Sequence, residues 1–208
     1  MPYPTTGSVT ELQAINQILA SVGQAPVTTL EKTNPDVAIS YETLMEVSRE
    51  VQSEGWTFNR EYDYPFVPNE AGEIPIPPNV LQLDLSNNPT YLLRTKYDTV
   101  RRDGKLYDRR GHTYKFTETI LCDVKWLFDW DDLPLPVRDY ITCRAAAIVS
   151  TRIVGDSTQY SMLQQKESYM RAMAIEYEAN QGDYSFFGFP RDGSNYISYQ
   201  PYKSLQRY

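Results

Sequence analysis

The sequence contains few residues that could carry chemistry. Its 208 residues include a single histidine, His112, and only two cysteines, Cys122 and Cys143. One imidazole and two widely separated thiols do not form the clustered ligand pattern of a zinc site. No glycine-rich loop of the kind that cradles phosphate groups is present. We therefore expect no metal site, no cofactor and no nucleotide site.

Long apolar runs are also missing. No stretch approaches the roughly 18 apolar residues that a membrane-spanning helix needs. The opening residues, MPYPTTGSVTELQ, lack the basic start and apolar run of a signal peptide. Two cysteines do not make a disulfide-stapled secreted framework, so we expect both to be small buried side chains. These absences predict a protein that folds in a reducing cytoplasm and does not insert into a membrane.

The chain does contain enough apolar material for a folded core, and much tyrosine. Hydrophobic residues make up 41% of the chain, and 17 residues are tyrosine. Tyrosine can bury its ring while its hydroxyl binds water or a polar partner group, so it is common at interfaces. A tyrosine-rich sheet is the alternative interpretation of this composition. The net charge of −7 argues against a free nucleic-acid-binding module, although it would suit a surface over which DNA slides.

The first predicted helix spans about residues 11–22. Apolar residues recur there at steps of three and four, at Leu12, Ile15, Leu19 and Val22. Either Ser8 with Glu11 or Thr10 with Gln13 has the spacing of a capping box, and Gly23 suits the helix end.

A second helix is predicted from Pro35 to Glu54, with Asn34 as its cap and Gly55 as its stop. One edge of this helix carries an acidic stripe, formed by Glu42, Glu46, Glu50 and Glu54. Like charges at this spacing repel, at a cost of roughly 0.2–0.5 kcal/mol per pair. The stripe is either a solvated face, a surface that meets the arginines of a neighbouring subunit, or the lining of a channel.

The middle of the chain, residues 56–132, changes to a β pattern. Its prolines exclude long helices, and Asp103-Gly104 is a strong signal for a two-residue hairpin turn. The predicted strands are 64–67, 80–85, 97–102, 105–108, 113–116 and 120–128. We interpret this region as an antiparallel β domain inserted between helical segments.

Helical patterns return after residue 132. One helix is predicted over 138–154 and another from about 157 to 180, capped by Asp156 or Ser157, with an apolar stripe at Leu163, Met170, Met173 and Tyr177. The sequence therefore predicts an α+β fold, in which residues 1–55 and 133–182 form a helical bundle. Residues 183–208 are predicted to be an extended aromatic tail that docks either on its own domain or, as we favour, on another subunit or the portal. The candidate contact residues are Tyr184, Phe186, Phe187, Phe189, Tyr196, Tyr199 and Tyr202.

Basic side chains are concentrated in residues 94–115, and include Arg101, Arg102, Arg109 and Arg110. This basic segment could contact an acidic patch on a neighbouring protein, form a solvated face of the hairpins, or touch phosphates as a DNA-binding module.

Acidic residues are densest at Asp129, Asp131 and Asp132. Paired carboxylates can hydrolyse glycosides, but acids before a helix start are more often partners of the helix dipole. Because no nucleophile motif accompanies His112, we predict no catalytic residues and expect the protein not to be an enzyme.

Several segments, in this order, resemble the tail tubular protein A family of short-tailed bacteriophages. They include ELQAINQILASVGQAPVTTL at 11–30, GWTFN at 55–59, IPIPPNVLQLDL at 74–85 and VRRDGKLYDR at 100–109. The resemblance continues through the helical segment at 132–146 and ends at Arg171-Ala172-Met173 with Glu176.

This resemblance implies a structural protein of the virion tail, made in the host bacterium. Members of the family form a head-to-tail adaptor ring, typically of about twelve copies, built from heterologous contacts. The implied partners are further copies of the chain, the portal protein, the tail nozzle protein and the tail fibre protein. Genomic DNA would pass through the channel and contact it transiently.

Overall fold

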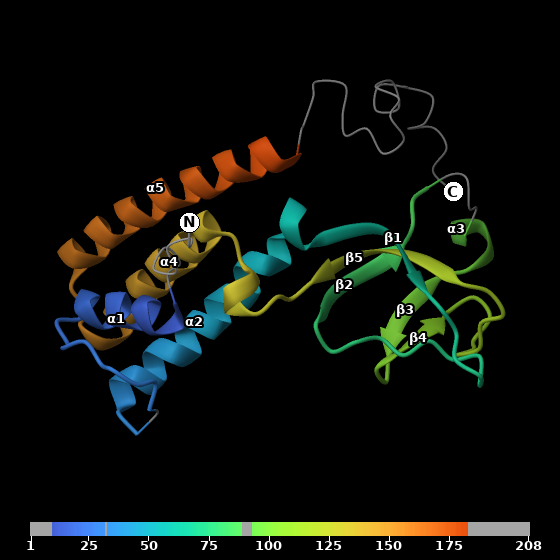
Figure 1. The fold of residues 1–208 in the computed structure, drawn as a ribbon, viewed down its shortest axis with the longest axis horizontal. Coiled ribbons are helices and arrows are strands. Elements are labelled where there is room, and N and C mark those ends of the chain that lie inside the picture. The colour runs from blue at the N-terminus through green and yellow to red at the C-terminus, as the bar shows by residue number, and fades with distance from the viewer. Residues whose placement is uncertain (1–9, 32, 89–92, 183–208) are drawn as a thin grey trace, which may run out of the picture.

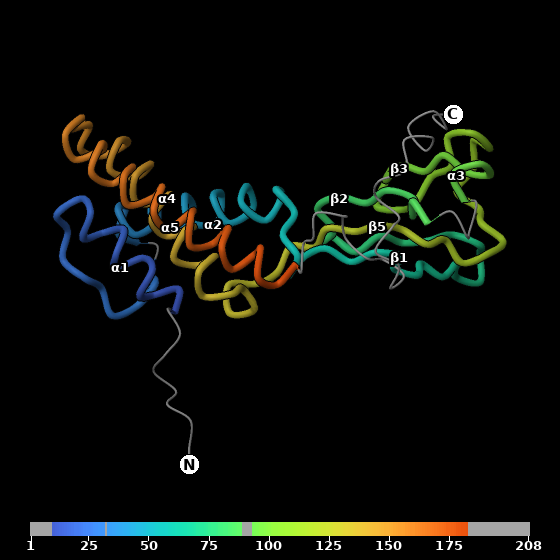
Figure 2. Tube along the Cα trace, turned by 90° about the horizontal axis from the view of Figure 1, so that it is seen from above, coloured from blue at the N-terminus to red at the C-terminus, as the bar shows by residue number. Residues whose placement is uncertain are grey.

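The computed structural model describes residues 10–31, 33–88 and 93–182, and its fold is α+β (Figure 1). The helices α1 (Glu11–Ser21), α2 (Pro35–Glu54), α4 (Leu135–Ile153) and α5 (Ser157–Gly182) gather at one end. The strands occupy the other end, so the molecule is elongated in both views (Figures 1 and 2). The prediction that N-terminal and C-terminal helices pack together, with an antiparallel β segment inserted between them in the sequence, is confirmed. The predicted aromatic tail lies outside the described residues.

A capping box fixes the start of α1. The Thr10 hydroxyl accepts a hydrogen bond from the Gln13 backbone N–H at 3.2 Å, and the Gln13 side-chain oxygen accepts from the Thr10 N–H at 3.1 Å. The predicted pair of Thr10 with Gln13 therefore forms a capping box, whereas Ser8 lies outside the described residues. The helix buries Ala14, Ile15, Ile18 and Leu19. Leu12 and Val22 are only half-buried, so the buried face is rotated from the predicted one.

The second helix, α2, has the predicted start and end. The Asn34 side chain accepts from the Asp36 N–H at 3.0 Å, and Pro35 opens the helix. Gly55 ends it in the left-handed region, with φ of 83°. This backbone conformation favours glycine, because side chains on other residues strain it.

At the centre of the helical part, α4 contacts α1, α2 and α5. The helix begins before the predicted Arg138, because Pro136 is tolerated in a first turn. Each large side chain that it buries stabilises the fold by about 1.5–3 kcal/mol. Its contribution to the helical core comprises Val137, Tyr140, Ile141, Ala145, Ala146 and Val149.

The last helix, α5, is capped by Asp156, whose side chain accepts from the Thr158 N–H at 2.8 Å. The apolar stripe predicted for α5 is partly wrong. Met173 is 41% exposed, and Ala174 is the side chain of this helix that is fully buried. A small residue lies there because α5 packs closely on α4.

The β part contains two antiparallel sheets. Strands β1 (Arg60–Phe66), β5 (Ile120–Trp126) and β2 (Val80–Leu85) form one sheet in that order. Strands β3 (Thr99–Arg102) and β4 (Lys105–Asp108) form a hairpin. Short helical turns complete this part: α3 (Leu93–Lys96), η1 (Thr57–Asn59) and η2 (Trp130–Asp132).

The hairpin turn has the predicted geometry. Asp103 and Gly104 have φ of 51° and 70°, as a turn of the mirror type requires. The strand predicted over 113–116 is wrong, because this segment makes only isolated bridges, through Thr113 and Lys115. The short helix α3 was not predicted from the sequence.

A second hydrophobic core lies between the two sheets. Its most buried side chains include Ile74, Leu106 and Ile120. Cys122 belongs to this core, and burial raises the pKa of its thiol to about 12. Cys143 lies in α4 and burial raises its pKa as well. Both cysteines are buried free thiols, as predicted. Among the described residues, no helix is long and apolar enough to cross a membrane.

Two buried amides join the helical part to the β part. The Gln52 side chain accepts from the Phe128 N–H at 2.8 Å and donates to the Phe128 carbonyl at 3.1 Å. The Asn59 side chain donates to the carbonyls of Gln52 and Trp126, both at 2.8 Å, and accepts from the Trp56 N–H at 2.8 Å. The chain passes between the two parts twice, and these hydrogen bonds link the two connecting segments to each other.

Replacing Asn59 with alanine should therefore lower the free energy of unfolding by about 3 kcal/mol, because an unpaired buried polar group costs about 1–3 kcal/mol. Urea unfolding followed by tryptophan fluorescence measures the change. The control is Asn180→Ala on the exposed surface of α5, which should change stability by less than about 0.5 kcal/mol. Equal small effects for the two variants would contradict the assigned role of Asn59.

Candidate functional site

The acidic stripe of α2 is paired with arginines of the same chain. Glu46 binds Arg152 at 3.2 Å and Glu50 binds Arg144 at 2.9 Å. Glu54 lies 3.4 Å from Arg171 and 3.9 Å from Arg144. These arginines belong to α4 and α5. The stripe therefore does not need a neighbouring subunit to offset its repulsion.

The pairs are partly exposed, so each stabilises the fold by less than about 1 kcal/mol. Burial works against the charge of Arg144, but the Tyr140 hydroxyl and Glu50 outweigh it and raise the pKa of Arg144. Glu42, the first member of the stripe, is exposed. The stripe and its arginines form a charged edge along α2, α4 and α5.

The predicted basic segment is engaged within the β part. The Arg101 guanidinium donates to the Val80 carbonyl at 3.0 Å, and Arg102 lies over the Tyr107 ring at 4.2 Å. Arg109 binds Asp98 at 2.7 Å.

Arg110 donates to the carbonyl of Thr95. The structure thus gives these arginines local partners, while leaving their charge at the surface.

Asp108 organises the loop that follows β4. Its carboxylate accepts from the backbone N–H groups of Asp98 at 3.0 Å, Arg110 at 3.1 Å and Gly111 at 2.9 Å. Burial alone would raise the pKa of Asp108, but these donors and the charge of Arg110 outweigh it and hold that pKa below its usual value. Asp108 holds this loop in place, and His112 sits at its tip with φ of 50°.

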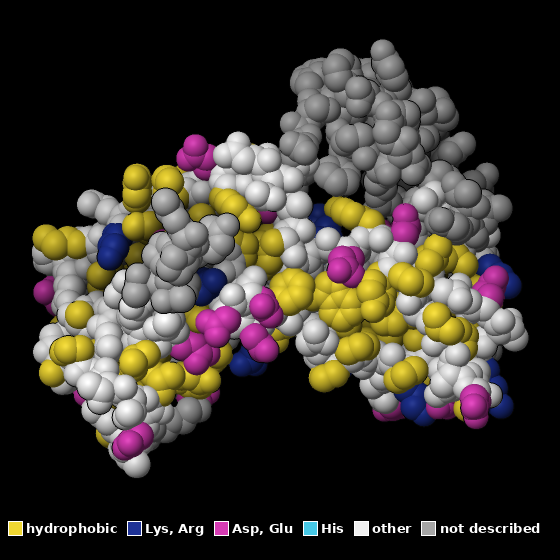
Figure 3. Space-filling model, viewed as in Figure 1, with side chains coloured by type: hydrophobic (Ala, Val, Ile, Leu, Met, Phe, Trp, Pro, Cys, Tyr) yellow, Lys and Arg dark blue, Asp and Glu magenta, His cyan; other side chains and the backbone are white. Residues whose placement is uncertain are grey.

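Two of the predicted acids, Asp129 and Asp131, line a groove between α1, α2 and η2. The groove has a volume of about 390 Å³, and its lining combines aromatic, aliphatic, polar and charged side chains: Glu11, Tyr41, Met45, Ser48, Arg49, Leu127, Phe128, Asp129, Trp130 and Asp131. Acidic side chains also gather beside the junction of the two parts on the face shown in Figure 3. Asp132 does not line this groove.

Glu11 is the member of this groove that sequence reasoning missed. Burial, followed by the charges of Asp131 and Asp129, raises the pKa of Glu11. Asp131 itself also lies 4.0 Å from Arg138. No local pattern relates Glu11 to acids more than a hundred residues away, so only the fold brings them together. Within the described ranges, no group of three or more His, Cys, Asp or Glu side chains could hold a metal ion.

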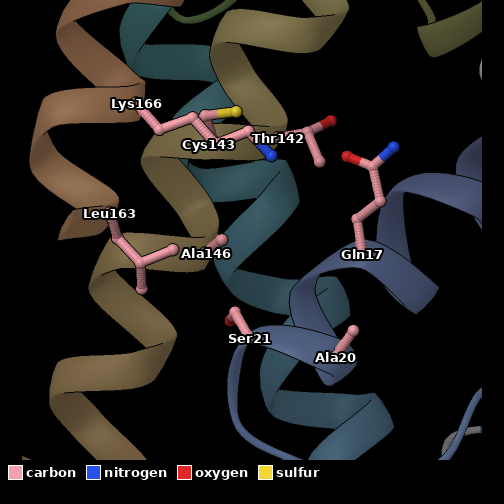
Figure 4. Close-up of a pocket in the computed structure, with 8 residues that line it drawn as sticks. All are labelled: Gln17, Ala20, Ser21, Thr142, Cys143, Ala146, Leu163 and Lys166. Atoms are coloured by element: carbon pink, nitrogen blue, oxygen red, sulfur yellow. The ribbon is translucent and has the colours of Figure 1, made fainter. Parts of the chain in front are cut away.

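A second, more apolar groove of about 300 Å³ lies between α1, α4 and α5 (Figure 4). Thr142, Cys143 and Ala146 of α4 line it between the other two helices. Lys166 is its only charged lining residue.

The predicted tail residues lie outside the described part of the chain. They are Tyr184, Phe186, Phe187, Phe189, Tyr196, Tyr199 and Tyr202.

The family model of the tail tubular proteins matches residues 12–184, and the chain belongs to this family. It is also similar to the tail tubular protein A of Klebsiella phage KP34, with 27% identity over 176 residues, 82% of this chain and 88% of the relative. The protein is therefore a structural component of a bacteriophage tail.

The Asp108 loop gives a pH-dependent prediction. Because the folded pKa of Asp108 is lowered, its carboxylate stabilises the fold above the unfolded pKa, and this stabilisation is lost as pH falls through the folded pKa. Asp108→Asn should lower stability by about 1–3 kcal/mol at neutral pH, and the difference from wild type should shrink below pH 3.8.

Urea unfolding across this pH range measures the effect. Glu70→Gln, on the surface of the β part, serves as the control and should show no such convergence. A difference for Asp108→Asn that stays constant down to the lowest pH would rule out the proposed carboxylate contribution.

Proposed function

We propose that the protein is a subunit of the head-to-tail adaptor ring of a short-tailed phage. The ring joins the portal to the tail nozzle, provides an attachment surface for tail fibres and lets genomic DNA pass through its channel. The family match carries this proposal, because it spans the helical part and the β part together. The resemblance implies about twelve copies, which heterologous contacts would close into a ring.

The arrangement of the chain supports distinct roles for its two ends. The helical part forms the wall of the ring, and the β part projects toward the nozzle and fibres. The buried amides Gln52 and Asn59 hold the two parts together, so the projection keeps a fixed direction. The net charge of −7 suits a channel that repels DNA phosphates.

Three sets of residues are proposed to make partner contacts. The first is the charged edge with Glu42, Glu46 and Glu50. The second is the group of arginines in the β part, which comprises Arg101, Arg102, Arg109 and Arg110. The third is the aromatic tail after Gly182, which we propose docks on a neighbouring subunit or on the portal. Arg101, Arg102, Arg109 and Arg110 would then serve contacts with the nozzle or fibre proteins.

Mixing the full chain with the portal protein should produce rings on the portal, visible by electron microscopy and as large particles in size exclusion with light scattering. The variant Glu46→Lys/Glu50→Lys should form fewer complete rings, because it places lysines against Arg152 and Arg144 and reverses the charged edge.

Glu70→Lys in the β part is the matched charge-reversal control and should leave rings intact. A chain that never associates with the portal would reject the adaptor role. Normal rings from Glu46→Lys/Glu50→Lys would remove only the charged edge from the proposed contacts.

Glycan hydrolysis is a second candidate function, favoured by the aromatic-lined groove at Glu11. A carboxyl group with a raised pKa can donate a proton to a leaving group, and a neighbouring carboxylate can activate water or attack the sugar. Glu11 would be the acid, and Asp129 or Asp131 the second carboxylate.

Incubation with a panel of polysaccharides, followed by a reducing-end assay, tests this activity. Turnover should fall as the pH rises through the raised pKa of Glu11, and Glu11→Gln should abolish it, while Glu70→Gln should not. Absence of turnover by the wild-type chain, or full turnover by Glu11→Gln, would rule out this second function.

A further inference from the structure

Two opposite flanks of α5 expose apolar side chains. The face of α5 toward α4 contains Leu163, Met170 and Ala174, which leaves the sides of the helix free of α4. Figure 3 shows apolar side chains along the edge of the helical part where α5 runs in Figure 1. A solvated helix usually carries charged residues on its outer side, so these flanks require an explanation.

The first flank lies on the side of α1. Met162 is 65% exposed, Tyr169 is 63% exposed and Met173 is 41% exposed. At about 100° per residue, the three side chains lie within roughly 40° of one another around α5. Lys166 projects from the same side and lines the apolar groove that α5 forms with α1 and α4 (Figure 4). We call this surface the α1-side flank.

The second flank lies on the side of α2, where Arg171 of α5 pairs with Glu54. Tyr160 is 40% exposed and Ile175 is 47% exposed. Each lies two positions from a member of the first flank, and residues two apart on a helix point to opposite sides. We call this surface the α2-side flank.

The surface of α5 between the flanks also has little charge. At helical spacing it carries Thr158, Ser161, Gln165, Ser168, Ala172, Glu176 and Ala179. Glu176 is the only ionised side chain in this set. The outer side of α5 is therefore unlike an ordinary water-facing helix surface.

The presence of two different apolar surfaces on opposite sides of α5 favours a head-to-tail contact between copies of the chain over a two-fold one. A two-fold dimer would bury a single self-complementary patch, whereas a head-to-tail contact buries two different patches. The glutamates beside the α2-side flank are already paired within the chain, Glu46 with Arg152 and Glu50 with Arg144, so the match between the two flanks rests on their exposed apolar side chains.

We propose that the α1-side flank of one copy packs against the α2-side flank of the next copy. This inference rests on the proposed ring and identifies the surfaces that build it. Tyr169 of one copy then lies against the region of Ile175 in its neighbour. Because the two patches lie on opposite sides of α5, the contact repeats from copy to copy.

Cysteine trapping tests this contact in the full chain mixed with portal protein. All variants carry Cys143→Ala, since Cys143 lines the groove, while Cys122 is buried and can stay. After mild oxidation, Tyr169→Cys alone and Ile175→Cys alone should stay monomeric in denaturing gels. A mixture of the two should give a dimer, and one chain with both substitutions should give a ladder of larger products.

The matched control replaces Tyr169→Cys with Val67→Cys, another exposed apolar position, which lies in the β part. This pair should not cross-link. Dimers from Tyr169→Cys alone would show a two-fold contact and overturn the proposal. Rings on the portal without any cross-link between the flanks would also overturn it and leave the adaptor role intact, whereas a chain that does not bind portal at all would remove the adaptor role itself.

A second measurement does not depend on cysteine geometry. Tyr169→Glu and Ile175→Glu should each fold with wild-type circular dichroism, because both positions are exposed, and each should prevent rings on the portal. Val67→Glu should form rings normally. Wild-type rings from both flank variants would contradict the proposed contact.

Discussion

The connection between the two parts of the molecule depends on the hydrogen bonds of Gln52 and Asn59. The chain passes from helices to sheet near residue 56 and returns near residue 128, and these buried amides bind both passages. An amide supplies donors and acceptors together, so it can satisfy backbone groups of two segments that do not form a sheet. This connection helps to fix the direction of the β part relative to the helices.

The end of α5 reinforces the same junction. The Glu178 carboxylate accepts from the Thr57 N–H at 2.8 Å and from the Thr57 hydroxyl at 2.6 Å. The GWTFN segment, which carries part of the family resemblance, is therefore the place where α2, α5 and the sheet meet. This segment stabilises the fold by connecting the helical part to the β part.

The surface of the helical part has a region of paired charges and a region with few charges. The acidic stripe of α2 is balanced by Arg144, Arg152 and Arg171 of the same chain, whereas the outer side of α5 has few charges and several exposed apolar side chains. Desolvating charges costs free energy unless they find partners, while apolar flanks gain from burial. This difference is the reason why we propose that α5 makes the contact between copies.

The sequence by itself determined the helix and strand classes, because caps, glycines and periodicity act locally. Asn34, Gly55 and the Asp103-Gly104 turn all behave as their local chemistry predicts. The sequence also showed the resemblance to its family. The segment at 113–116 was misjudged because a β propensity does not create a strand when no partner strand runs beside it.

Only the tertiary structure decided which charges meet and which surfaces stay uncovered. The spacing of Glu46 and Glu50 placed them on one edge, but their arginine partners come from helices about a hundred residues later. In the same way, Glu11 reaches Asp129 and Asp131 only through the packing of α1 beside η2. Local sequence patterns determine the direction in which each side chain points. The long-range packing of α4 and α5 determines which side chains lie opposite it.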